Sequence, residues 1–318
     1  CSWLKRLETF SAVVLIIAVR FLHMDTTKFT GPSEIEVPVE YNSRDLILYA
    51  LGIGSKDHRF VYENHELFAA FPTYAIVLMF KGNSFSTLPF PPPSLTSFPT
   101  PPLQGVKAGL DAEKKIERLA ELPKDGSKLK LVGRVCGIHK KGPGALVERE
   151  YKLVGEDGTT YYKMIDAAML VGAKDFQDSG ITHSKNNLPP KDMQPMHVFN
   201  EKTDEHQPML YRLSGDYNPL HIDPMMSQMM GFEKPIMHGQ CTMGIICRVL
   251  LEKLANSDQR RYKSIAVRFA SPVIPGDTLS IEVWPKTSTD FIFQAKNQST
   301  GKVCVSNGLL ELHPEAKL

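Results

Sequence analysis

Alternating apolar and polar positions predict two groups of β-strands, each interrupted by turn sequences. A period of two is typical of strands with one buried face. In the first half the pattern occupies residues 128–132, 145–153 and 160–170, with turns at Lys141-Gly142-Pro143-Gly144 and Gly155-Glu156-Asp157-Gly158. In the second half it occupies residues 264–269, 278–284, 290–297 and 302–312, with turns at Pro275-Gly276-Asp277 and Ser299-Thr300-Gly301.

Helical patterns precede each group of strands. Short ones lie at residues 45–52 and 209–213, and a long one runs over residues 245–255. The long segment is apolar on nearly all sides, which predicts a buried helix. Both halves therefore have the order of helix followed by strands, and this favours a duplicated unit.

A short internal match supports the duplication. Leu48-Tyr49-Ala50-Leu51 aligns with Leu210-Tyr211-Arg212-Leu213 at an offset of 162 (210 − 48). The same offset places Asp216 on Gly54 and His221 on Arg59. The first half therefore has the scaffold position of these two residues without their chemistry.

Two segments break the pattern. A proline-rich block covers residues 84–105, and we expect it to be exposed and disordered, because proline lacks the backbone donor and fixes φ. We expect it to be neither a helix nor a central strand. The second break, at residues 179–194, contains Asn186-Asn187-Leu188-Pro189-Pro190 and is interpreted as a linker between the halves.

Composition narrows the class of protein. A chain of 318 residues is long enough for two compact units, and 42% hydrophobic with 23% charged residues is ordinary for a globular protein. A net charge of +2 gives no indication of a nucleic-acid partner. The five cysteines (Cys1, Cys136, Cys241, Cys247 and Cys304) show no paired spacing. That argues against a disulfide framework or a zinc site and fits a reducing compartment.

Both ends of the chain carry candidate targeting features. The apolar run at residues 12–19 is interrupted by Arg20 and is too short to span a membrane, which needs roughly 20 residues. A signal peptide is the alternative, but Met24 resembles a normal start, and we expect the residues before it not to belong to the working protein. At the other end, Ala316-Lys317-Leu318 differs by one residue from a peroxisomal address and suggests recognition by an import receptor.

The densest group of polar residues lies in the segment Tyr211-Arg212-Leu213-Ser214-Gly215-Asp216-Tyr217-Asn218-Pro219-Leu220-His221. It places Asp216, Asn218 and His221 on a turn that contains Gly215 and Pro219. An aspartate beside a neutral histidine can move a proton in both directions near neutral pH. The segment therefore predicts general acid–base chemistry, such as the addition or removal of water.

A second segment, Pro235-Ile236-Met237-His238-Gly239, leads into the long helix. Unpaired N–H groups and the positive end of the helix dipole at Gly239 would favour a developing anion. The alternative is a helix start whose glycine only permits close packing. A further alternative makes His221, Asp223 and His238 ligands of a metal ion, and the interpretation preferred here has no metal.

These segments, with Ala266-Val267-Arg268-Phe269-Ala270-Ser271-Pro272-Val273-Ile274-Pro275-Gly276-Asp277, closely resemble the motifs of the hydratase 2 family, the MaoC-like (3R)-specific 2-enoyl-CoA hydratases. The resemblance covers about 34–82 and 125–314. It implies an α+β double hotdog: two antiparallel sheets, each wrapped on a helix and joined into one sheet, with the long central helix in the C-terminal half. In eukaryotic members the first half has lost much of its central helix, which leaves a cavity for a bulky acyl chain.

The implied reaction is the reversible syn addition of water to trans-2-enoyl-CoA in β-oxidation, giving (3R)-3-hydroxyacyl-CoA. In the implied roles, Asp216 and His221 activate water and return a proton, Asn218 orients the water, and the Gly239 N–H binds the thioester oxygen. Glu63 matches a family glutamate near the active site. The implied substrate- and CoA-binding residues are Tyr211, Gly215, His238, Lys234, Arg268 and Lys263.

The resemblance also implies an acyl-CoA substrate with no separate cofactor, a homodimer and a peroxisomal location, with neither nucleic acid nor stable membrane insertion. Two alternatives remain: a hotdog dehydratase or thioesterase on acyl thioesters, and a non-catalytic acyl-CoA-binding module. We expect an extension at 1–33, a degenerate hotdog at 34–180 with the insertion at 84–105, a linker at 181–194 and a catalytic hotdog at 195–318.

The chain departs from the family between Lys81 and Leu122. There the family has a glycine-containing helix and a His-Gly-Glu strand, whereas this chain has the proline-rich block followed by Ala112-Glu113-Lys114-Lys115-Ile116-Glu117-Arg118-Leu119. We therefore expect the sheet of the first half to be disturbed at this point.

Overall fold

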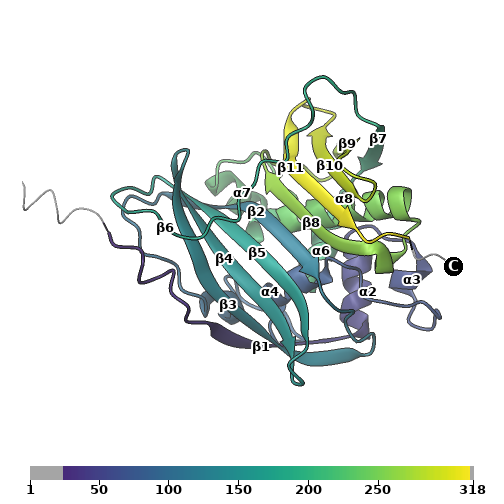
Figure 1. Cartoon of the computed structure of the whole chain (residues 1–318), viewed down its shortest axis with the longest axis horizontal. Helices are drawn as coiled ribbons and strands as arrows, with labels where there is room; N and C mark the ends of the chain where they lie inside the picture. The colour runs from purple at the N-terminus through teal and green to yellow at the C-terminus, as the bar shows by residue number, and fades with distance from the viewer. Residues whose placement is uncertain (1–23, 316–318) are drawn as a thin grey trace, which may run out of the picture.

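The structure, a computed structural model, describes residues 24–315 and shows one long antiparallel sheet (Figure 1). The strand order is β1-β3-β4-β5-β2-β8-β11-β10-β9-β7, and β6 pairs with β3. The strands are β1 (Ile35–Asn42), β2 (Ala108–Arg118), β3 (Gly126–Lys141), β4 (Gly144–Gly155), β5 (Thr160–Val171), β6 (Ser179–Gly180), β7 (His197–Lys202), β8 (Tyr262–Phe269), β9 (Thr278–Pro285), β10 (Asp290–Asn297) and β11 (Val303–Leu312).

The helices are short except for α8. The α-helices are α2 (Ser43–Gly52), α3 (His58–Val61), α4 (Leu78–Lys81), α5 (Pro93–Thr96), α6 (Gln207–Tyr211), α7 (Pro224–Met229) and α8 (Gly239–Ala255). The 3₁₀ helices are η1 (Tyr74–Val77), η2 (Arg212–Ser214), η3 (Pro219–His221) and η4 (Gln259–Arg261). No helix among the described residues is long and apolar enough to cross a membrane.

Strand β2 joins the two halves into one sheet. It pairs with β5 of the first half and with β8 of the second, where Ile116 lies opposite Ile265. The expected disturbance of the first-half sheet is therefore wrong. The segment after the proline-rich block keeps buried residues at alternate positions, Lys114 and Ile116, so it forms a central strand although it lacks the His-Gly-Glu sequence.

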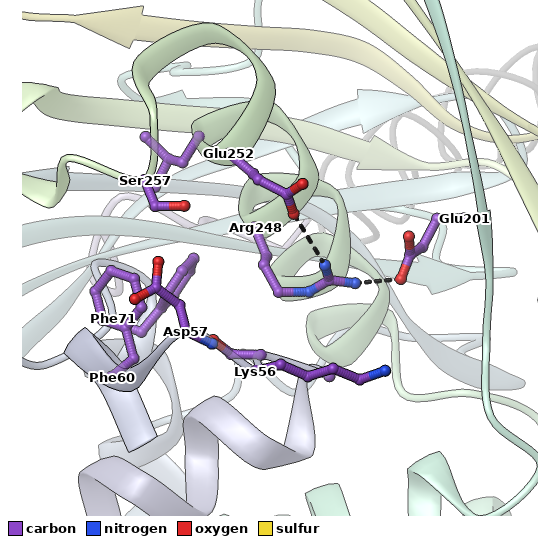
Figure 2. Close-up of a pocket in the computed structure, with 11 residues that line it drawn as sticks. Lys56, Asp57, Phe60, Phe71, Glu201, Arg248, Glu252 and Ser257 are labelled. Carbon is purple, nitrogen blue, oxygen red and sulfur yellow. Dashed lines mark hydrogen bonds and ion pairs between the residues drawn. The ribbon is translucent and has the colours of Figure 1, made fainter. Parts of the chain in front are cut away.

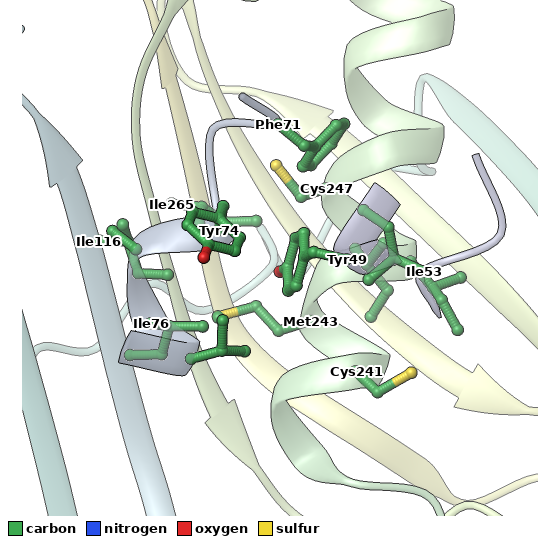
Figure 3. Close-up of a cluster of buried hydrophobic side chains, with 14 of the residues drawn as sticks. Tyr49, Ile53, Phe71, Tyr74, Ile76, Ile116, Cys241, Met243, Cys247 and Ile265 are labelled. Carbon is green, nitrogen blue, oxygen red and sulfur yellow. The ribbon is translucent and has the colours of Figure 1, made fainter. Parts of the chain in front are cut away.

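Helix α8 and segments of the first half share one hydrophobic core (Figure 3). Met243 of α8 lies beside Tyr49 and Tyr74, whose ring centroids are 5.6 Å apart. The Oη atom of Tyr49 is hydrogen bonded to Oγ1 of Thr73 at 2.8 Å. Because both halves contribute to this core, the first-half segments hold α8 in place from the side away from its own strands.

The duplication is visible in the core. Tyr49 of α2 and Tyr211 of α6, which the offset of 162 aligns, pack against each other with ring centroids 5.9 Å apart. The longest helix among the described residues of the first half is the ten-residue α2, whereas α8 has 17 residues. Instead of a long helix, η1 and α4 fill the interior with fully buried side chains, among them Ile76 and Leu78.

The expectation for the proline-rich block is wrong in part. Residues 93–96 form α5, which begins with Pro93 at a first-turn position where a missing N–H costs nothing. The Ser94 hydroxyl donates to the Met79 carbonyl at 2.9 Å, and Phe98 packs edge-on against Tyr151 with ring centroids 4.9 Å apart. The block therefore covers one end of the first-half core.

Among the described residues, Cys136, Cys241, Cys247 and Cys304 are buried and form no disulfide. Cys1, the apolar run at 12–19 and the tail Ala316-Lys317-Leu318 lie outside the described residues. The sequence patterns missed β1 and β7, which form the two edges of the sheet.

Candidate active site

Gly215 brings the acid–base turn against the first half. Its φ of +132° is unfavourable for other residues. A Cβ atom at this position would lie 2.7–2.9 Å from the backbone N and Cα and the Cβ of Lys81. The glycine is therefore required so that the chain ending η2 can pass close to α4 and deliver Asp216 to the interior.

Local hydrogen bonds hold the turn that follows. The backbone N–H of Asn218 donates to Oδ1 of Asp216 at 3.2 Å, and Oδ1 of Asn218 accepts from the N–H of Leu220 at 3.1 Å. Pro219 occupies the first turn of η3, where proline is favoured. Asn218 therefore shapes the turn that places His221 beside Asp216. We propose that it acts through this turn rather than by holding water.

Backbone carbonyls fix both histidines of the site. His221 Nδ1 lies 2.9 Å from the Ile236 carbonyl, and His238 Nε2 lies 3.2 Å from the Asp216 carbonyl. A carbonyl can only accept, so each of these nitrogens carries the proton of a neutral ring. His221 therefore presents Nε2 as an acceptor, and His238 presents Nδ1, which is buried and unpartnered among the described residues.

Burial shifts the protonation equilibria of these groups in opposite directions. Burial raises the pKa of Asp216 to about 7, although the Asn218 N–H opposes this by stabilising the carboxylate. Burial lowers the pKa of His221 to about 4 and that of His238 well below its ordinary value. Near neutral pH both rings are therefore uncharged, and Asp216 is the group that changes its protonation state.

In the structure, the residues that lie together as candidate metal ligands differ from those expected. Asp223 caps α7 through the N–H of Met225 at 2.8 Å, so it is not the third member of a cluster with the histidines. Asp216, His221 and His238 instead have one potential ligand atom each within 4.8 Å of one another. The two ring planes, however, are inclined by only 30° with centroids 3.7 Å apart, so their in-plane lone pairs could not both meet one ion without rotation.

Helix α8 begins next to this pair. Its N-cap, His238, makes no side-chain capping bond, so the first N–H groups of the helix have no such partner. A Cβ at Gly239 would lie 3.1–3.2 Å from the Phe269 ring, so the glycine also permits close packing here. The anion-site and packing interpretations of Gly239 therefore both fit the geometry.

Several buried polar atoms around the pair have no hydrogen-bond partner among the described residues. Such atoms are rare in folded proteins and are explained by bound water or a ligand. The ones in this region are Tyr211 Oη, Ser214 Oγ, His238 Nδ1 and Gln240 Oε1. They indicate a polar space suited to water and a polar substrate group.

Three expected site residues are not brought to this place. Glu63 is exposed on the turn that follows α3. Helix α3 lies at the C-terminal end of α8, because its Arg59 donates a hydrogen bond to the carbonyl of Asn256, the C-cap of α8. Helix α8 is about 25 Å long at 1.5 Å per residue, so Glu63 lies at the end opposite Gly239. Lys263 lies six residues from Phe269 on β8, a distance of roughly 20 Å, and pairs with Glu311 at 3.2 Å.

Arg268 is the third of these residues. Successive strand residues point to opposite faces, so Arg268 faces away from α8 while Phe269 packs beside Gly239. Its Nε donates to Glu113 Oε1 at 2.9 Å. Of the expected phosphate-binding cations, only Lys234 remains near the pair: it is exposed, two residues before Ile236, whose carbonyl holds His221.

A cavity of about 400 Å³ lies at the first-half counterpart of the site (Figure 2). Gly54, the counterpart of Asp216, lines it. Arg248 projects along one wall and forms ion pairs with Glu201 and Glu252 (Figure 2). The cavity therefore has charged side chains but no acid–base pair.

Sequence reasoning missed Asp111 and Lys114. They lie on β2, and their charges act on Asp216: Asp111 raises its pKa and Lys114 lowers it, after the larger effects of burial and of the Asn218 N–H. A period-two pattern at residues 114–116 could have indicated a strand here. The strand went unseen because a lysine occupies the buried position.

The fold defines a double-hotdog protein in which Asp216 and His221 are buried together beside the start of α8. The family models for the MFE-2 hydratase 2 N-terminal domain and the MaoC like domain match residues 39–172 and 187–307. The chain is 34% identical to the probable enoyl-CoA hydratase 2 of Dictyostelium discoideum over 88% of this chain and 94% of that protein. It is 36% identical to the peroxisomal multifunctional enzyme type 2 of Drosophila melanogaster over 93% of this chain.

A solved MaoC-like dehydratase from Phytophthora capsici is 36% identical and superimposes with a TM-score of 0.87 over 92% of this chain and 99% of that one. The chain belongs to the MaoC-like hydratase 2 family. It spans about half the length of the Drosophila relative, covering 50% of it.

Proposed function

We propose that this protein catalyses the (3R)-specific hydration of trans-2-enoyl-CoA in fatty-acid β-oxidation. The observation that carries the proposal is the buried pair of Asp216 and His221 beside the uncapped start of α8. Its relatives named enoyl-CoA hydratase 2 support the assignment. Relatives named as dehydratases fit the same site, because dehydration is the reverse of this reaction.

In the proposed reaction a water molecule lies between the Asp216 carboxylate and Nε2 of His221. Asp216 takes a proton as the water oxygen bonds to C3. The C2–C3 π pair moves toward the thioester, and its oxygen becomes an enolate that the Gly239 N–H stabilises. C2 then takes the proton back from Asp216 on the same face. One water is consumed and the pair returns to its starting state.

The neutral histidines suit these roles. His221 accepts a hydrogen bond from the water through Nε2, because its proton is held at Nδ1 by the Ile236 carbonyl. His238 fixes the Asp216 backbone through Nε2, and its Nδ1 is buried without a hydrogen-bond partner among the described residues. We propose that Tyr211 shapes the site by packing on His238, with ring centroids 4.9 Å apart.

The remaining assignments extend the same proposal. We assign the N-terminal hotdog to 34–180 and the catalytic hotdog to 195–318. CoA is part of the substrate, and Lys234 is the cation placed to meet its phosphates. A peroxisomal location is supported by relatives named as peroxisomal. A homodimer is proposed from the family resemblance alone.

The test follows the enoyl-thioester absorbance of trans-2-enoyl-CoA with purified protein and then determines the configuration of the product. We expect the absorbance to fall and the product to be (3R)-3-hydroxyacyl-CoA. A (3S) product, or release of free CoA as by a thioesterase, would refute the assignment. Tight binding of the enoyl-CoA without turnover would instead identify an acyl-CoA-binding module.

A further inference from the structure

A buried lysine lies on the sheet face that α8 covers. Lys114 stands on β2 between Asp166 of β5 and Val267 of β8, which are its partners in the two adjacent ladders. Its side chain is only 4% exposed. Val267 is two residues from Phe269, which points to the same face and packs beside Gly239. Lys114 therefore belongs to the layer that forms the floor of the candidate active site.

Carboxylates hold the lysine on two sides. The Lys114 ammonium group forms an ion pair with Asp111 at 2.6 Å and another with Asp166. Arg149 approaches Asp166 from β4 at 3.8 Å. A buried ion pair adds little net stability, because the cost of desolvation offsets the attraction between the charges. Stability alone therefore does not account for a lysine at this position.

We propose that Lys114, held by Asp111 and Asp166, is a positioning residue that sets the protonation of the Asp216 carboxyl from the other half of the chain. The inference rests on the proposed function, in which Asp216 transfers the proton. The two residues act in opposite directions on the same group, since Asp111 raises and Lys114 lowers the pKa of Asp216. The pKa of the neighbouring Tyr211 is raised mainly by burial, and Asp111 adds to this shift.

The other groups near Asp216 do not set its charge environment, because they are uncharged or already paired. Both histidines are uncharged near neutral pH. Lys81, beside Gly215, is occupied by Asp45 at 3.5 Å and by two backbone carbonyls. The titratable and charged groups on the elements packed around Asp216 are Tyr211, Arg212, His221, His238, Lys81, Asp111 and Lys114, and of these Asp111 and Lys114 are the ones whose charges shift the pKa of Asp216.

The test titrates the Asp216 carboxyl directly by ¹³C NMR, with its signal assigned by its loss in Asp216→Asn. We expect Lys114→Met to raise the pKa of Asp216 and Asp111→Asn to lower it, each by about half a unit or more. The titration requires no turnover, so it can be interpreted even if the hydration assay fails. In an active hydratase, the acid limb of kcat/KM moves with the same signs.

Lys141→Met is the matched control. Lys141 pairs at 2.9 Å with Glu113, which precedes Lys114 on β2 and points to the opposite face of the sheet. Loss of the Lys141 charge should therefore leave the pKa of Asp216 unchanged. Shifts of the same sign in Lys114→Met and Asp111→Asn, or none in either, would overturn the proposal. If Lys114→Met does not fold, Asp111→Asn decides alone, because it keeps the pair of Lys114 and Asp166 and must lower the pKa.

Discussion

His221 and His238 lie face to face in the interior, with ring centroids 3.7 Å apart and planes inclined by 30°. Burial disfavours the cation of each ring and lowers both pKa values, and the backbone carbonyls that hold Nδ1 of His221 and Nε2 of His238 oppose this only in part. The pair is therefore uncharged at neutral pH. The protonation state of the site near neutral pH therefore depends on Asp216, whose pKa is about 7.

The pH dependence of hydration follows from this arrangement. The water-activating form of Asp216 is the carboxylate, so we expect kcat/KM for hydration to rise with pH and reach half its plateau near pH 7. His221, with a pKa of about 4, is already neutral across that range and should add no limb above pH 5. Initial rates from pH 5 to 9 check this, and a kcat/KM that does not change with pH over that range would contradict the raised pKa of Asp216.

Stability provides a test that needs no substrate. The raised pKa of Asp216 means that folding favours its protonated form, so the carboxyl costs stability as pH rises from about 4 to about 7. The free energy of unfolding of Asp216→Asn, relative to the parent, should therefore increase by about 4 kcal/mol between pH 4 and pH 8. Urea unfolding at both pH values measures the difference.

His221→Gln is the opposing control for that experiment. The lowered pKa of His221 means that folding disfavours its cation, so the histidine costs stability as pH falls from about 6.5 to about 4. Its replacement should be relatively most stabilising at low pH, by about 3 kcal/mol. If both variants show the same pH trend, the opposite shifts assigned to the two groups are wrong.

The close approach at Gly215 predicts a large cost for a single methyl group. Gly215→Ala adds a Cβ within 2.9 Å of the Lys81 backbone at a φ of +132°. We expect its free energy of unfolding, measured with urea, to fall by about 3 kcal/mol or more. Gly231→Ala is the control, because its φ of +86° is also positive but nothing lies within 4 Å. The free energy of unfolding of Gly231→Ala should fall by only about 1 kcal/mol. Equal losses would show that backbone strain, not the contact with α4, requires glycine.

Lys234 and Lys263 are expected to differ in their effect on the binding of CoA. Lys234→Met should raise KM for enoyl-CoA several-fold, and the increase should diminish at high salt, because phosphate contacts are screened. Lys263→Met should leave KM unchanged, because Lys263 pairs with Glu311 at the far end of α8. A larger effect from Lys263 than from Lys234 would reverse this assignment.

The sequence was sufficient for the last four strands and for the turn that brings Asp216 and His221 together. Period-two runs identified β8 to β11, and the motif around Gly215 placed Asp216, Asn218 and His221 on a turn that the structure reproduces. These features are local, since they depend on residues a few positions apart. The buried helix α8 was predicted for the same reason.

The features that sequence patterns missed depend on long-range contacts. Strand β2 carries Lys114 at a buried position, which obscures the alternation of buried and exposed residues. The lysine can be buried there because it forms ion pairs with Asp111 and with Asp166 of the neighbouring strand. Glu63 and Lys263 were assigned to the site by resemblance, but their places follow from the length of α8 and the direction of β8. Which end of an element a residue occupies is not readable from a motif alone.

The most direct test of the central claim compares Asp216→Asn and His221→Gln with Asp223→Asn in hydration of trans-2-enoyl-CoA. Asp223 lies on the same stretch of chain, but it only caps α7, and asparagine can replace it there. We predict that each of the first two variants lowers turnover by a factor of about 100 or more, as expected for loss of general acid–base catalysis, and that Asp223→Asn stays near the parent. Unchanged turnover in Asp216→Asn or His221→Gln would contradict the account.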